Sequence, residues 1–199
     1  MKQTTKQIGF AVIAGALAIG GIATATTPVE AASKSVQKDK PAKKSAKQVK
    51  ADKALGKTKA HFKKHKLGKP FDKPVTGKIT NPHGERKSPF GVGMQFHEGV
   101  DIAAKKGVAV KASYTGKIVE ASSNEILGKY VVIEHDLKGE TFKTTYAHLD
   151  QYNVKVGQTV KQGRAIGKVG KTGRATGEHL HFEIEDETGV SIDPEEIME

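Results

Sequence analysis

From Val75 onward, the chain alternates short runs of β-branched and aromatic residues with glycine-bearing turns. The runs lie at 108–110, 117–119, 130–133, 141–146, 165–166 and 180–184. No long stretch in this part repeats apolar residues every 3.6 positions, as an amphipathic helix would. Several short strands with Gly or Asn between them predict an all-β, Gly-rich, mainly antiparallel domain, which we place at residues 70–199.

The segment Gly177–Glu183 predicts a strand with two histidines on one face. Because side chains alternate along a strand, His179 and His181 share one face, and Leu180 and Phe182 point to the other, where they can anchor the strand in a core. Two imidazoles on a rigid strand suit a zinc site in which one binds the metal and the other acts on the substrate. An isolated His-x-His pair is more often a surface feature, but this pair is not isolated.

A second group of polar residues, His97 and Asp101, lies upstream and is separated by Gly99. We expect a loop leading into a strand there. Asp101 stands between Val100 and Ile102, where an unpaired carboxylate would be costly to bury, so we expect it to have a partner, either a backbone amide or a metal. The chain has no cysteine, so any metal must be held by His, Asp or Glu.

Together with His148 in a Tyr-Ala-His-Leu segment, these motifs resemble the lysostaphin-type (Gly-Gly endopeptidase-like) family of zinc endopeptidases that cut bacterial peptidoglycan. The resemblance runs from about residue 75 to residue 194. It includes the motifs at 84–86, 97–104, 146–149, 156–163, 179–181 and 193–194. It implies a Gly-rich antiparallel sheet with an active-site groove above it and zinc at the floor of the groove.

The resemblance also implies roles for individual residues. His97, Asp101 and His181 would bind one Zn²⁺, and His148 and His179 would be the catalytic pair. Three protein ligands leave a fourth position for water or substrate, as in catalytic zinc sites. Zinc activates water near neutral pH, and amide hydrolysis then needs proton removal, oxyanion stabilisation and proton delivery to the departing amine. Imidazole titrates in the right range, and either His148 or His179 can be the general base.

Three further side chains need an interpretation. His83 precedes Gly84-x-Arg86, at a position where the family more often has an aromatic residue. We expect His83 and Arg86 to line the substrate groove. For His83 the first alternative is a satisfied surface position, and a less favoured one is transient binding of the metal. We interpret His135, at a strand end, as structural.

The N-terminal residues have the order of a secretory signal. Lys2 and Lys6 precede an uncharged, mostly apolar run at 8–25, and small residues stand at the −3 and −1 positions of a cleavage point after Ala31. The apolar run is shorter than the roughly 20 residues that span a bilayer comfortably, although an uncleaved anchor is the alternative. We predict a signal peptide at 1–31 and a protein that is secreted or held at the cell wall.

Between the predicted signal and the domain, residues 32–69 form a Lys/Ala-rich basic linker. Residues 1–69 carry 16 Lys and Arg against 3 Asp and Glu, whereas residues 70–199 carry 17 against 19. With so few apolar residues, we expect disorder or a fluctuating helix. The segment is either a solvated linker or, at 33–69, a contact with an anionic cell-wall polymer or membrane surface. Nucleic acid is not expected as a partner of an exported protein.

The predicted function is that of an exported, monomeric zinc endopeptidase whose substrate is peptidoglycan, cut in a cross-bridge or in a stem peptide. The alternative is a catalytically silent wall-binding or regulatory domain of the same fold. Such domains typically lack one or more ligands, whereas this chain has all five His and Asp positions. The bond that is cut depends on the loops around the groove, which sequence patterns do not define.

Overall fold

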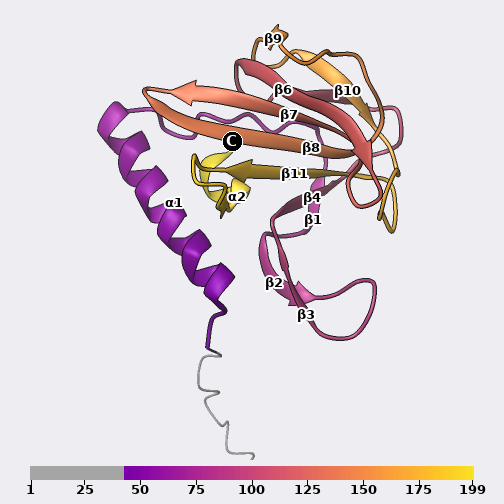
Figure 1. The fold of residues 1–199 in the computed structure, drawn as a ribbon, viewed down its shortest axis with the longest axis horizontal. Helices are drawn as coiled ribbons and strands as arrows, with labels where there is room; N and C mark the ends of the chain where they lie inside the picture. The colour runs from indigo at the N-terminus through magenta and orange to yellow at the C-terminus, as the bar shows by residue number, and fades with distance from the viewer. Residues whose placement is uncertain (1–42) are drawn as a thin grey trace, which may run out of the picture. The chain divides into compact units, whose positions relative to one another are not determined.

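A computed structural model describes residues 43–199, so the predicted signal peptide lies outside the described residues. Ten strands form one large sheet, and β2 and β3 form a separate hairpin (Figure 1). All pairings between these strands are antiparallel. The prediction of an all-β, mainly antiparallel domain is therefore confirmed.

The elements follow one another in a simple order. The strands are β1 (Lys78–Asn81), β2 (Gly84–Lys87), β3 (Met94–His97), β4 (Gly99–Ala103), β5 (Ala109–Lys111), β6 (Gly116–Asn124), β7 (Gly128–Leu137), β8 (Glu140–Tyr152), β9 (Thr159–Val160), β10 (Ala165–Val169), β11 (His179–Glu185) and β12 (Ser191–Ile192). The helices are α1 (Ala46–His65) and α2 (Pro194–Ile197). The main path through the large sheet is β1-β4-β11-β8-β7-β6-β9; β12 pairs with β11, and β10 pairs with both β8 and β5.

The longest strands, β7 and β8, form a hairpin closed by the two residues Lys138 and Gly139. Both have positive φ, 59° and 89°. Two-residue turns of this kind match the right-handed twist of the strands they join, and glycine adopts the conformation at little cost. The hairpin places β8 beside β11, where Ala147 pairs with His181.

One hydrophobic core lies beneath the central strands. Both β11 and β4 contribute fully buried side chains, and the β7–β8 hairpin adds more. These include Val100, Ile102, Val131, Ile133, Phe142, Tyr146, Leu149, Leu180, Phe182 and Ile184. The strands β4 and β11, which carry Asp101 and His181, are thus fixed by apolar side chains on their opposite face.

Helix α1 corrects the prediction of disorder or a fluctuating helix for residues 46–65. It begins at an N-cap, where the Ser45 hydroxyl accepts a hydrogen bond from the backbone N–H of Gln48. Four residues spaced three or four apart point to the domain and are buried. They are Ala51, Ala54, Thr58 and Phe62. The helix belongs to the same compact unit as the sheet.

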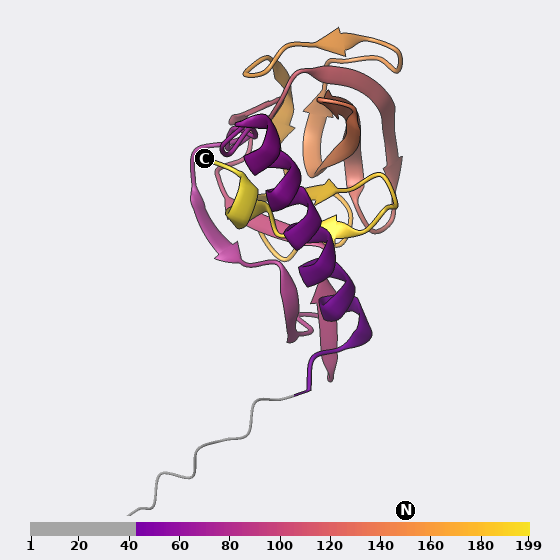
Figure 2. The ribbon, with the colours of Figure 1, turned by 90° about the vertical axis from the view of Figure 1, so that its left-hand side faces the viewer.

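The Phe62 ring anchors this helix in the core. Its centroid lies 6.4 Å from that of Phe71 and 5.6 Å from that of Phe142. Burying a side chain of this size contributes about 1.5–3 kcal/mol, which helps to offset the entropy of ordering the helix. Figure 2 shows α1 lying along the side of the domain. Within residues 43–199, neither helix is long and apolar enough to cross a membrane.

Candidate metal centre

Three strands bring the predicted ligands together. His97 is the last residue of β3; only Glu98 separates it from β4, in which Asp101 is the third residue. His181 lies in β11 directly opposite Asp101 in the antiparallel register. Leu180 is fully buried on the other face of β11, as the alternation predicted.

The donor atoms of the three side chains form a small triangle. His97 Nε2 lies 3.1 Å from His181 Nδ1 and 3.2 Å from Asp101 Oδ1, and His181 Nδ1 lies 2.8 Å from the same oxygen. Donors bound at about 2.1 Å around a tetrahedral zinc ion are about 3.4 Å apart. Since this donor set and spacing fit a metal, the three residues could hold one zinc ion.

In each of the two histidines, the second ring nitrogen has its own hydrogen-bond partner, which explains why His97 Nε2 and His181 Nδ1 face the centre of the triangle. His97 Nδ1 is 2.8 Å from the carbonyl oxygen of Pro82, which can only accept, so Nδ1 carries the hydrogen and Nε2 faces inward. His181 Nε2 is 2.8 Å from a carboxylate oxygen of Glu183, which leaves Nδ1 for the centre. Such contacts fix the orientation and tautomer of metal-binding histidines.

Asp101 is held in its ionised form. Burial disfavours the charge, but the close contacts with His181 and His97 outweigh burial and keep the pKa of the carboxyl far below its usual value. Its second oxygen accepts a hydrogen bond from Asn81 Nδ2 at 3.0 Å, and Arg86 Nη1 lies 3.6 Å away. One carboxylate oxygen is therefore oriented by these neighbours while the other faces the histidines.

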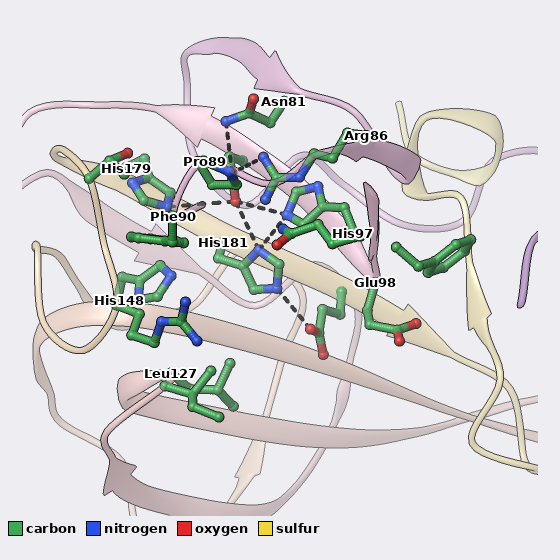
Figure 3. A pocket seen from close by; sticks show the side chains of 17 residues that line it. Asn81, Arg86, Pro89, Phe90, His97, Glu98, Leu127, His148, His179 and His181 are labelled. Atoms are coloured by element: carbon green, nitrogen blue, oxygen red, sulfur yellow. Dashed lines mark hydrogen bonds and ion pairs between the residues drawn. The ribbon is translucent and has the colours of Figure 1, made fainter. Parts of the chain in front are cut away.

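Two further imidazoles, those of His148 and His179, stand beside this triangle (Figure 3). Their ring centroids are 4.8 Å apart, and the His148 ring is 5.8 Å from that of His181. Each Nδ1 faces a carbonyl oxygen, that of Thr172 at 2.8 Å and that of Gly177 at 3.0 Å. Both Nδ1 atoms therefore carry hydrogen, and both Nε2 atoms are available as proton acceptors.

Two loops hold His148 in an unusual backbone conformation, with φ of 61°. Its N–H donates to the carbonyl of Leu127 at 2.8 Å. The loops meet at Gly128 and Gly173, which also have positive φ; a Cβ on Gly173 would lie 2.2 Å from the backbone nitrogen of Gly128. Burial, and then the nearby histidines, lower the pKa of His148 to about 4, so the ring is neutral at pH 7.

A pocket opens over the five residues. Its floor is the triangle with the two imidazoles, and its rim comes from the β2–β3 hairpin, the β6–β7 turn and the loop before β11. The rim and wall residues include Arg86, Pro89, Phe90, Glu98, Ile126, Leu127, Arg174 and Thr176. The Arg174 guanidinium lies 4.6 Å from the centroid of the Phe90 ring and so connects two sides of the rim.

Of the two side chains predicted to line the groove, the structure places only one in the pocket wall. Arg86 lines the pocket, as expected. His83 is not among the lining residues; its Nε2 lies 3.1 Å from Ser191 Oγ, and its ring packs against Phe96 with centroids 5.1 Å apart. His83 thus takes the satisfied position that was the alternative. His135 is buried and hydrogen-bonded away from the pocket, in agreement with a structural role.

Comparisons with known proteins agree with this arrangement. Residues 95–194 match Peptidase family M23. The peptidoglycan DD-endopeptidase ShyB of Vibrio cholerae serotype O1 is 39% identical over 115 residues, which are 58% of this chain and 26% of ShyB. This chain spans about a quarter of the length of the curated relatives that it matches first, 26%, 27% and 20%.

Solved structures share the fold. A zinc-containing peptidase from Vibrio cholerae aligns with a TM-score of 0.57 and 37% identity, covering 62% of this chain and 39% of that one. The catalytic domain of the antimicrobial peptidase lysostaphin from Staphylococcus simulans aligns with a TM-score of 0.53 and 36% identity, covering 60% of this chain and 90% of that one.

Proposed function

Since the chain belongs to Peptidase family M23, we propose that it is a zinc-dependent endopeptidase that hydrolyses peptide bonds in bacterial peptidoglycan. The observation that carries this proposal is the convergence of His97, Asp101 and His181 on one point, with the imidazoles of His148 and His179 beside it. The similarity to a peptidoglycan endopeptidase supports the substrate class.

The site residues have two roles: three of them would bind the metal, and two would transfer protons. His97, Asp101 and His181 would hold zinc, which supplies Lewis-acid chemistry and lowers the pKa of water to about 7. The unprotonated Nε2 atoms of His148 and His179 are positioned to accept a proton from water and deliver it to the departing amine. Once protonated, an imidazole also stabilises a nearby negative oxygen. Thr172 and Gly177 keep both rings in the required tautomer.

We further propose that the protein acts outside the cytoplasm, where peptidoglycan lies, as a monomer. The basic and then apolar order of residues 1–31 supports export. The pocket supports a role for Arg86 as a contact with the bound peptide, because its side chain lies in the wall beside Asp101.

The test is release of new amino groups from purified peptidoglycan by the chain that lacks residues 1–31. Release should stop with a chelator, return with zinc, and be lost in His181→Ala and His148→Ala. Zinc content should fall only in His181→Ala, and His65→Ala, on α1, serves as the matched control. Sequencing the freed amino termini identifies the bond. Release that survives both the chelator and the substitutions would refute the proposal, and zinc binding without release from several wall types would favour the silent-domain alternative.

A further inference from the structure

Helix α1 carries a row of exposed lysines on the side turned away from the domain core. Lys50, Lys53, Lys57 and Lys64, here called the lysine face, are separated by three, four and seven residues, so they follow one side of the helix. At 1.5 Å per residue, the row is about 21 Å long. The buried residues of α1 face the domain, so docking of the helix fixes the direction in which the lysine face points.

Two other lysines of the helix form ion pairs. At its edges, Lys47 pairs with Glu98 and Lys59 pairs with Glu196, and both contacts fasten α1 to the domain. Within residues 43–199, no member of the lysine face forms an ion pair. Asp52, the one acidic residue of α1, accepts hydrogen bonds from Lys44 and Gln48. The lysine face therefore presents a row of uncompensated positive charge.

This pattern works against the stability of the helix. Like charges three or four residues apart on a helix repel one another. Asp186 and Glu187 lie close enough to share a surface hollow with Lys57 and Lys64 but form no ion pair with them. A polyanion lying along the row would replace repulsion with attraction at each lysine. Lysine binds phosphate as a point charge without a fixed geometry, which suits a flexible polymer.

The surface around the row favours a polymer over a lipid bilayer. A helix that lies on a membrane inserts a broad apolar face beneath its cationic one. The apolar side of α1 is already buried against the domain, and Val49 is the one large hydrophobic residue of α1 that is exposed. The lysine face thus offers charge with little apolar surface to insert.

We propose that the lysine face is a docking surface for a linear phosphodiester polymer of the bacterial cell wall. The first turn of α1 lies beside the active-site pocket, because Lys47 Nζ is 2.5 Å from Glu98, which lines it. A polymer bound along α1 is thereby held next to the pocket and keeps the domain at the wall. The cell-wall source of the polymer rests on the proposed function, whereas binding itself is independent of catalysis.

The test measures binding of fluorescent poly(glycerol phosphate) by the full chain with a chelator present, so that hydrolysis plays no part. The variant replaces the four lysines of the lysine face with Gln, which keeps helix propensity. A matched control replaces four exposed lysines elsewhere with Gln and so has the same net charge. They are Lys111, Lys155, Lys161 and Lys168. Circular dichroism establishes that both variants are folded.

We expect the wild-type affinity to fall steeply with added salt, because binding neutralises several charges. The lysine-face variant should bind at least tenfold more weakly, and the control should stay within twofold of wild type. Equal weakening of both variants would overturn the proposal in favour of non-specific attraction by net charge. Binding to phosphatidylglycerol vesicles without binding to the polymer would overturn it in favour of a membrane.

Turnover of a small soluble peptide separates this proposal from the proposed function. If both are right, the lysine-face variant keeps wild-type turnover while losing polymer binding. If the proposed function fails, neither protein turns over the peptide, yet the difference in polymer binding persists and still supports the docking surface.

Discussion

Acidification should destabilise the protein through His135, a buried histidine of β7 that is not part of the metal centre. Its Nδ1–H donates to the carbonyl of Thr115 at 3.0 Å, and its Nε2 lies 2.7 Å from the hydroxyl of Thr144. The rings of Phe71 and Tyr114 pack around it, with centroids 5.8 and 6.0 Å away. Both nitrogens of the neutral ring are therefore satisfied, and protonation would place a charge in the core.

The size of the effect follows from the shift in the pKa. Burial lowers the pKa of His135 from 6.5 to about 4, and the hydrogen bond to Thr115 opposes this only in part. As the pH falls, the unfolded chain therefore binds the proton first. The stability linked to the neutral ring is present above pH 6.5 and is lost as the pH falls towards 4. At 1.36 kcal/mol per pKa unit, the loss is about 2 kcal/mol at pH 5 and about 3 kcal/mol at pH 4.

The assay compares wild type with His135→Asn, which keeps an N–H donor for Thr115 but does not titrate. Urea denaturation of the metal-free proteins is followed by circular dichroism, since the chain has no tryptophan. The histidines of the metal centre are the same in both proteins, so their contribution cancels in the difference. We expect the variant to be less stable at pH 7 and the gap to close by about 2 kcal/mol between pH 7 and pH 5.

A control and a direct titration make the result decisive. Burial also lowers the pKa of His65, near the end of α1, but that ring lies outside the core, so His65→Asn should change the pH dependence of stability much less than His135→Asn does. In NMR spectra, the ring protons of His135 should titrate with a midpoint near pH 4. Parallel stability curves for wild type and His135→Asn, or a midpoint near 6.5, would refute the reasoning.

Three further predictions concern packing and the metal. Phe62→Ala should lower the free energy of unfolding, measured by urea denaturation, by about 3–5 kcal/mol. Val49→Ala, at an exposed position of the same helix, should change it by less than about 0.5 kcal/mol. Equal effects of the two substitutions would show that α1 does not dock on the domain. Glu183→Gln should weaken zinc binding about 10–100-fold in competition with a chromophoric chelator, because His181 loses its orienting carboxylate. Glu185→Gln, two residues further along the same face, should not. Removing zinc should abolish activity and lower Tm, because zinc binds the native state preferentially, and one equivalent should restore both; a Tm that is independent of zinc would count against the assigned site.

The sequence predicted the two faces of β11 because the period of a strand leaves no choice about which side chains share a face. His179 and His181 accordingly face the pocket, while Leu180 lies in the core. The same alternation brings Glu183 to the metal side, but carboxylates at strand ends are common on solvated surfaces, and nothing in the pattern marks this one.

The hydrogen-bond partners of the histidines and the docking of α1 could not be predicted from the sequence pattern. The carbonyls of Pro82, Thr172 and Gly177 orient three of the histidines. Because every residue has a carbonyl, only the folded chain reveals which carbonyls accept hydrogen bonds from the histidine rings. For residues 46–65 the sequence predicted disorder or a fluctuating helix, because the buried side of α1 consists mainly of Ala and Thr, which give little hydrophobic signal. One aromatic ring, that of Phe62, packs against Phe71 and Phe142 and anchors the helix in the core.

The loops that meet at Gly128 and Gly173 form part of the pocket wall and also hold His148. Leu127, in the wall, accepts the backbone hydrogen bond of that histidine, and Thr172 fixes its ring. A substitution that reshapes this wall for a different peptide therefore also moves a reacting group. In the proposed enzyme, a substitution in these loops that changes the preferred peptide would therefore also change the turnover rate. Directed evolution towards a different cross-bridge should instead find mutations that change specificity alone on the opposite rim, in the β2–β3 hairpin.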